Sequence, residues 1–129
     1  MGETSDEARD EIKRARDALD DARVLSDGGG TTGGVINRLY YASFHAAQAA
    51  LYARGENPSS HGHVRQQFGQ DVVLEGDASR EDGRLLGTLY DYRWEADYGG
   101  GELDVDTEHL LEEVAQFVDH MADLVAVDD

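Results

Sequence analysis

The segment from residue 36 to residue 51 repeats its large apolar side chains at the spacing of an α-helix. At about 100° per residue, five apolar residues fall on one side of such a helix: Ile36, Tyr40, Phe44, Ala47 and Leu51. Arg38, Tyr41 and His45 fall on nearly the opposite side. The first face is typical of a core, and the second offers a cation, a phenol and an imidazole. The segment therefore predicts a helix with one packing face and one polar face.

Four long segments and one short segment are predicted to be helical, and glycine-rich runs or the only proline separate several of them. We expect long helices from a cap at Thr4 or Ser5 to about residue 26, over about residues 35–54, from a cap at Ser79 to about residue 98, and after a cap at Asp104 or Asp106, with a short helix over about residues 63–70. Residues 72–74 are ambiguous and could form a short extended piece. The pattern predicts an all-α protein, an antiparallel up-and-down bundle of four long helices plus one short helix, in a single domain over residues 1–129.

The chain is strongly acidic. It has 28 acidic residues against 11 basic ones, a formal net charge of −17, and Lys13 is its only lysine. Disorder is one reading of such a charge, but 40% of the residues are hydrophobic and they fall in periodic patterns. High salt would screen the self-repulsion, because the Debye length is about 3 Å at 1 M. The acidic, lysine-poor composition resembles that of halophilic archaeal proteins.

Several classes of protein are excluded by what the sequence lacks. There are no cysteines, so the chain has neither disulfides nor a thiolate zinc site. No apolar stretch approaches the roughly 20 residues that cross a bilayer, and no basic region followed by an apolar run opens the sequence. We therefore expect a cytoplasmic protein without a membrane partner.

The acidic residues are unevenly placed along the chain. Residues 75–129 have a net charge of −14, whereas residues 34–74 have a net charge of +1. The less acidic segment contains Arg38, His45 and Arg65. Two explanations remain open: this segment is the most buried one, or it forms an anion-binding surface.

Arg38, Tyr41 and His45 form the first candidate site. Arginine offers a planar fork of donors to phosphate, and histidine titrates near neutrality, so His45 could act as a general acid or base. The alternative is that Arg38 pairs with an acid across the bundle and that His45 only packs.

Two further groups of polar residues are candidates. Arg93, Asp97 and Tyr98 lie at the end of the fourth predicted long helix, where Asp97 could pair with Arg93 or hold His45. His61 and His63 could supply metal ligands, with His45 as a third. Histidines in a polar loop are more often solvated or capping, so we expect no metal.

Two blocks of sequence resemble a known family. They are Arg-Leu-Tyr-Tyr-Ala-Ser-Phe-His-Ala-Ala-Gln-Ala at residues 38–49 and Leu-Tyr-Asp-Tyr-Arg-Trp-Glu-Ala-Asp-Tyr-Gly at residues 89–99, with Gly55, His61 and Phe68 between them. These blocks resemble the short HEPN-domain proteins of archaea and bacteria. The resemblance implies a helical bundle that is usually a homodimer and is often encoded beside a minimal nucleotidyltransferase. Many such proteins are toxins of toxin–antitoxin pairs, and the active members are metal-independent ribonucleases with an arginine, four to six residues and then a histidine.

The resemblance leaves two alternatives. Six residues separate Arg38 from His45, which matches the ribonuclease spacing. In the ribonuclease members, however, the motif lies near the end of a late helix. That position corresponds here to Arg93, which is followed by Asp97 and Tyr98 and by no histidine.

The first alternative is a HEPN module that dimerises, binds a nucleotidyltransferase partner, a nucleotide or RNA, and performs no catalysis and needs no cofactor. Its expected contacts are Arg38, Tyr41, His45, His61, Arg93, Asp97 and Tyr98. The second is an RNA endonuclease toxin that uses Arg38 and His45. Burial of His45 within its own bundle would disfavour the enzyme, and an open groove shared with Arg93 would favour it.

Overall fold

The computed structural model describes residues 3–58, 60–99 and 103–128, and over these residues it contains helices and no strand. The elements are α1 (Glu3–Asp27), α2 (Thr32–Ala53), α3 (His61–Gln67), the π-helix η1 (Phe68–Val73), α4 (Arg80–Tyr98) and α5 (Thr107–Asp128). The prediction of an all-α protein is confirmed. None of these helices is long and apolar enough to cross a membrane.

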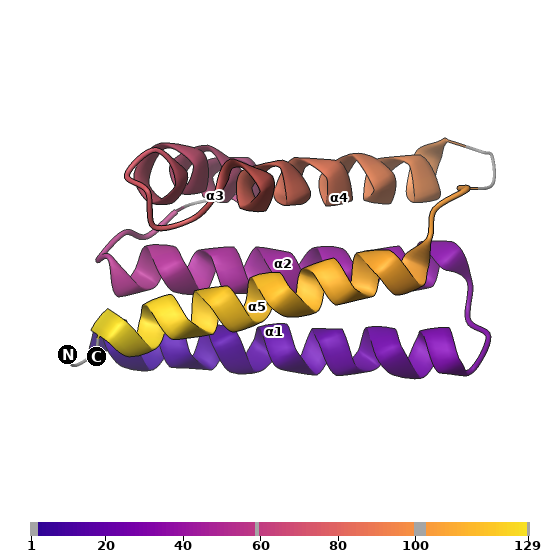
Figure 1. Ribbon diagram of the computed structural model, residues 1–129, viewed down its shortest axis with the longest axis horizontal. Helices are drawn as coiled ribbons and strands as arrows, with labels where there is room; N and C mark the ends of the chain where they lie inside the picture. The colour runs from indigo at the N-terminus through magenta and orange to yellow at the C-terminus, as the bar shows by residue number, and fades with distance from the viewer. Residues whose placement is uncertain (1–2, 59, 100–102, 129) are drawn as a thin grey trace.

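α2 is the central helix of the protein. It contacts α1, α4 and α5 as well as the shorter α3 and η1. Figure 1 shows α1 and α4 on opposite sides of α2, with α5 packed across α1 and α2. The N-terminal end of α1 and the C-terminal end of α5 lie at the same end of the molecule.

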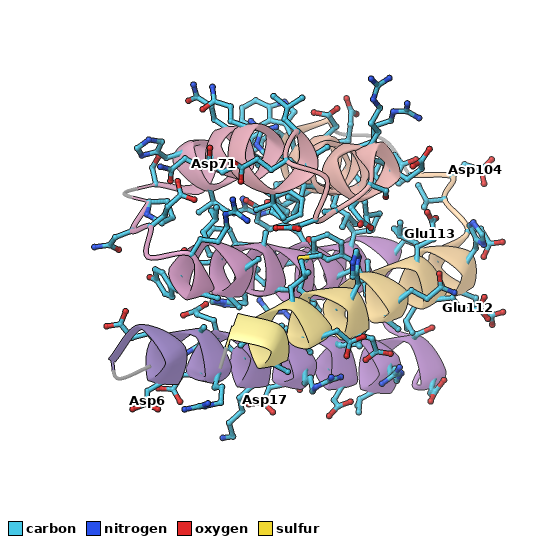
Figure 2. The ribbon with its side chains drawn as sticks, turned by 60° about the vertical axis from the view of Figure 1, so that its left-hand side comes forward. Asp6, Asp17, Asp71, Asp104, Glu112 and Glu113 are labelled. Atoms are coloured by element: carbon cyan, nitrogen blue, oxygen red, sulfur yellow. The ribbon has the colours of Figure 1, made fainter. Side chains whose placement is uncertain are left out.

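Because α2 is surrounded, the polar face that the sequence predicted, with Arg38, Tyr41 and His45, is only partly exposed. Twelve of its residues are buried, including Ala42, Ala46 and Ala49 on the expected polar side. Small alanine side chains let neighbouring helices approach closely from several directions. The low acid content of residues 34–74 thus has a packing explanation for the part that belongs to α2, which is about half of that segment. By contrast, Figure 2 shows labelled acids on the outer faces of α1 and α5.

Capping signals in the sequence predicted the starts of α4 and α5, whereas α1 and α2 begin earlier than expected. Ser79 accepts a hydrogen bond from the backbone of Asp82 at 3.0 Å and completes a capping box before α4. Asp106 caps α5 through the backbone of His109 at 3.1 Å. α2 begins at Thr32, before the expected residue 35, because the Thr31 hydroxyl accepts a hydrogen bond from the backbone N–H of Gly34 and so caps the first turn of the helix. α1 begins at Glu3, ahead of the expected cap at Thr4 or Ser5, so that prediction was wrong.

Residues 61–74 differ most from the expectation. The short helix begins two residues early, at His61, and passes at Phe68 into a turn of π-helix. The suggestion of an extended piece at residues 72–74 is wrong, because the Leu74 backbone donates to the Gly69 carbonyl at 3.1 Å. Phe68 and Val72 of this π turn lie in the core, where each is 0–1% exposed.

Candidate functional site

Three arginines from three helices lie over three tyrosines between α2 and α4. We call this group the tyrosine–arginine cluster; it consists of Tyr40, Tyr41, Tyr90, Arg38, Arg65 and Arg93. The guanidinium carbon of Arg38 lies 5.2 Å from the ring centre of Tyr41, and that of Arg93 lies 5.4 Å from the same ring. The guanidinium of Arg65 lies 4.2 Å from the ring centre of Tyr90. Cations over aromatic faces at these distances are attracted by the ring quadrupole.

The positive charges of the cluster have few acidic partners. Among the described residues, Arg38 and Arg65 have no ion pair, and Arg38 instead donates two hydrogen bonds to the side-chain oxygen of Asn37, at 2.8 and 3.1 Å. Arg93 has one ion pair, in which its Nε lies 3.8 Å from Asp97 Oδ2. Within the part of the chain that the structure describes, Arg38 therefore does not pair with an acid across the bundle, contrary to what one alternative proposed. The cluster keeps its charge in a protein that has an excess of acids.

The end of α4 adds two exposed aromatic rings to the cluster. Trp94 and Tyr98 are 56% and 71% exposed, and their ring centres are 4.4 Å apart. Together with Tyr90, Arg93 and Asp97 they line a cavity of about 110 Å³. Asp97 pairs with Arg93, as one of the sequence alternatives proposed. Rings beside a cationic group are typical of surfaces that stack nucleic-acid bases.

His45 is joined to a buried carboxylate on α1. The Nδ1 atom of His45 lies 2.6 Å from Glu11 Oε2, while Glu11 Oε1 accepts a hydrogen bond of 2.5 Å from Arg14. The His45 side chain is 24% exposed and that of Glu11 only 4%. Burial alone would raise the pKa of Glu11, but the hydrogen bonds and charges of His45 and Arg14 together lower it below its usual value.

Sequence reasoning did not select Glu11, although a signal was present. Glu11 lies three residues after Ala8 and four before Ala15, so it falls on the apolar face of α1. An acid at such a position is buried and needs a partner. Its carboxylate fixes the orientation of the imidazole and leaves Nε2 as the remaining ring nitrogen.

Tyr41 brings the two parts of the predicted site together. Its ring centre is 6.3 Å from that of His45, and it lies beneath Arg38 and Arg93. Burial raises the pKa of the neighbouring Tyr40, although the charge of Arg93 opposes this shift. The predicted residues Arg38, Tyr41, His45 and Arg93 thus lie around one ring. Arg65 and Tyr90 were not predicted, because only the placement of α3 and α4 beside α2 brings them into the cluster. Trp94, which contacts Tyr98, was not selected although it directly follows Arg93.

The predicted histidine pair is separate from this cluster. His63 is exposed, and its backbone N–H donates to Ser60 Oγ at 3.1 Å. The side chain of His61 lies outside the described residues. Within the part of the chain that the structure describes, no group of three or more histidine, cysteine or acidic side chains is placed to hold a metal ion.

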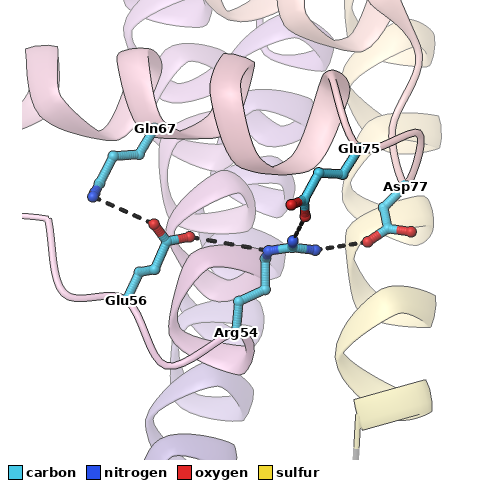
Figure 3. Close-up of polar contacts among 5 residues, drawn as sticks. All are labelled: Arg54, Glu56, Gln67, Glu75 and Asp77. Carbon is cyan, nitrogen blue, oxygen red and sulfur yellow. Dashed lines mark hydrogen bonds and ion pairs between the residues drawn. The ribbon is translucent and has the colours of Figure 1, made fainter.

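A second polar group lies at the other end of α2. Arg54 contacts three acids: its Nη1 is 2.7 Å from Asp77, its Nη2 pairs with Glu75, and its Nε is 4.0 Å from Glu56 (Figure 3). Gln67 also lies 3.4 Å from Glu56. These contacts tie the end of α2 to α3 and to the segment before α4.

Comparisons with known proteins give a consistent result. A family model described as the HEPN domain matches residues 8–125. A Methanocaldococcus jannaschii protein named "Putative toxin" is 36% identical over 87 residues, which cover 67% of this chain and 65% of that protein. A Thermotoga maritima "UPF0332 protein" has the same identity and coverage. A Gloeobacter violaceus "UPF0332 protein" is 31% identical over 115 residues, which cover 87% of this chain and 90% of that protein. The chain thus spans just under two thirds of the length of the first two relatives.

Proposed function

The chain belongs to the HEPN domain family, and we propose that it is a toxin-like HEPN module that binds RNA or a nucleotide, and a partner protein, without catalysis of its own. The observation that carries this proposal is the tyrosine–arginine cluster, in which three cations converge with a single acidic partner among the described residues. Guanidinium groups recognise phosphate, and exposed rings recognise bases.

The binding surface combines the cluster with the end of α4. Arg38 and Arg93 would contact backbone phosphates, because both guanidinium groups lie against the ring of Tyr41 and so place two cations close together. Trp94 and Tyr98 would stack with a base, because both rings are exposed. Sequence-tolerant binding of a single strand follows, since stacking on a ring does not distinguish bases strongly.

Two features support the absence of catalysis: the residues that follow Arg93 on α4, and the surroundings of His45. Arg93 is followed by Asp97, which pairs with it and cannot supply the cationic acid role of an imidazolium. His45 lies against a buried carboxylate and is mostly covered. These contacts favour a binding role for the residues around Tyr41.

The remaining parts of the proposal come from the family. We propose a homodimer, a minimal nucleotidyltransferase as partner protein, and a role in a toxin–antitoxin-like system. The name of the Methanocaldococcus jannaschii relative supports that role. We also propose that residues 1–129 form one domain with an antiparallel up-and-down bundle, which the continuous family match over residues 8–125 supports. The net charge of −17 and the single lysine support a halophilic source and a cytoplasm rich in salt.

One observation favours a second candidate, a metal-independent ribonuclease that uses Arg38 and His45. The contact between His45 and Glu11 is that of an imidazole oriented by a carboxylate, and such pairs occur in general acid–base catalysis. In this candidate the Nε2 atom of His45 would remove the proton from a ribose hydroxyl, while Arg38 would bind the scissile phosphate.

RNA binding and cleavage, measured side by side, test both candidates. A labelled single strand of about 12 nucleotides is titrated with folded protein at high salt, and the same samples are run on a denaturing gel. The binding module predicts intact RNA and an affinity that Arg93→Gln lowers about tenfold. Arg84→Gln, an exposed arginine on the same helix, is the matched control. Cleavage that His45→Ala abolishes in folded protein would establish the ribonuclease instead.

A further inference from the structure

A groove between α1 and α5 lies apart from the tyrosine–arginine cluster. Its volume is about 530 Å³, and α1 and α5 pack directly against each other along it. Ile12, Ala122, Val125 and Ala126 provide its apolar lining. The two alanines are four residues apart on α5, so no large side chain fills the space above them.

The rim of this groove has the opposite charge to the rest of the protein. Arg9, Lys13 and Arg16 line it, and they are three of only 11 basic residues in a chain of net charge −17. They are spaced four and three residues apart, so they form one stripe along about 10 Å of α1. Among the described residues that line the groove, Asp17 is the only acid. A coat that served only solubility would not gather cations beside an apolar groove.

The two arginines of the rim already contact carboxylates of this chain. Arg9 lies 2.7 Å from Asp6, and Arg16 lies 3.0 Å from Asp119. All four side chains are about half exposed or more, so these pairs are weak and can exchange for carboxylates of another molecule. Lys13, between the two arginines, has no ion pair with a described residue.

From the apolar lining and the cationic rim we infer that the α1–α5 groove binds an acidic amphipathic helix of a partner protein. The rim spans about two helical turns, which matches the reach of anchors at positions i, i+3, i+4 and i+7 of a docked helix. The apolar stripe of that helix lies on Ile12 and Val125, and its flanking carboxylates face Arg9, Lys13 and Arg16. The partner is therefore recognised by charge at the rim and by aliphatic packing at the floor.

A nucleic acid fits this groove less well than a helix does. The described residues that line the groove include no aromatic ring, whereas single-stranded nucleic acid is held by stacking on such rings. The inference rests on the partner-binding part of the proposed function and is independent of its RNA-binding part. None of the residues that line the groove belongs to the tyrosine–arginine cluster.

Two synthetic helical peptides test this inference against the full chain. Both carry the same leucine and alanine stripe; one flanks it with glutamates and the other with lysines. Binding of each labelled peptide is measured by fluorescence anisotropy over a range of KCl concentrations in which circular dichroism shows the protein folded. We expect the acidic peptide to bind, to bind more weakly as KCl rises, and to lose about tenfold in affinity with Lys13→Glu. Ala126→Trp, which fills the groove, should weaken it as well.

Arg23→Glu is the matched control, because Arg23 is an exposed arginine of α1 outside the groove. It should change the affinity less than twofold, a margin within the usual effect of a surface substitution. Equal binding of the two peptides, no binding of the acidic one, or an equal loss with Arg23→Glu would overturn the inference. Competition between the acidic peptide and single-stranded RNA would overturn it in favour of a nucleic-acid groove. A change in the sedimentation coefficient with Lys13→Glu would overturn the inference in favour of a second copy of this chain as the occupant of the groove. RNA affinity that Arg93→Gln leaves unchanged, while the acidic peptide still binds as expected, would be a failure of the RNA proposal and not of this one.

Discussion

The Nδ1 atom of His45 lies 2.6 Å from Oε2 of Glu11, a carboxylate whose side chain is only 4% exposed. This contact joins α1 to α2 through a charged group in the interior of the protein. A buried carboxylate without a partner is costly, so the two side chains depend on each other.

We expect Glu11→Ala to lower the free energy of unfolding by about 1–3 kcal/mol, because it leaves His45 and Arg14 without their acceptor. Chemical denaturation at constant high salt measures this change. Glu7→Ala, an exposed acid one turn earlier on α1, is the control and should change stability by less than about 0.5 kcal/mol. An equal effect of the two substitutions would mean that the contact with His45 contributes nothing.

The same contact makes the protein sensitive to acid. The pKa of Glu11 in the folded protein is lower than its usual value of 4.5, so folding favours the ionised form. The stabilisation is present above that usual value and is lost as the pH falls through the lowered pKa. We expect Glu11→Gln to reduce the slope of stability against pH in this range. Unfolding curves between about pH 3 and pH 6 measure that slope, and an unchanged slope would contradict the assignment.

Glu56 should have the opposite pH dependence. Burial raises its pKa to about 7, aided by the hydrogen bond and charge of Asp71 and opposed by Arg54. Because folding favours the protonated form, this group's contribution to stability is present below its usual pKa of 4.5 and is lost as the pH rises towards 7. Glu56→Gln should therefore flatten the decline between about pH 5 and pH 7 and make the protein more stable at neutral pH.

Thermal unfolding at several pH values, in wild type and in Glu56→Gln, checks this expectation. Asp71→Asn should lower the pKa of Glu56 towards its usual value and remove part of the decline. Asp77→Asn touches the same Arg54 from another side and serves as the control for a general weakening of the contacts in Figure 3. A decline that survives both Glu56→Gln and Asp71→Asn would assign it to another group.

Features that depend on local sequence were predicted, and features that depend on contacts between helices were not. The capping box at Ser79 and Asp82 is complete within four residues, so the sequence alone defines the start of α4. The π-helix at Phe68–Val73 buries Phe68 and Val72, but helical spacing in the sequence does not distinguish it from an α-helix. Helical periodicity therefore predicted the all-α class but not this irregular turn.

The same distinction holds for the site. Arg38, Tyr41 and His45 are close in sequence, so one helix was enough to group them. Arg65 and Tyr90 join the cluster only because α3 and α4 both pack on α2. Glu11 was missed because acids were read as solvated, and its place on the apolar face of α1 was the signal to the contrary.

Trp94 is the only tryptophan of the chain and offers a direct reporter of the proposed RNA contact. Its ring is 56% exposed and lies beside Tyr98 in the cavity that Arg93 also lines. We expect single-stranded RNA to quench its fluorescence, because a stacked base changes the surroundings of the indole. The concentration dependence of the quenching gives the affinity without any label.

Arg93→Gln should shift this quenching curve to about tenfold higher RNA concentration, since it removes the cation beside the stacked base. Arg84→Gln removes the same charge from α4, but at a position outside the cavity, so the quenching curve should not shift. Quenching that ignores Arg93→Gln, or RNA that binds without changing the fluorescence of Trp94, would place the RNA contact away from the end of α4. Because both variants have the same net charge, a difference between them reports the position of the charge and not its amount.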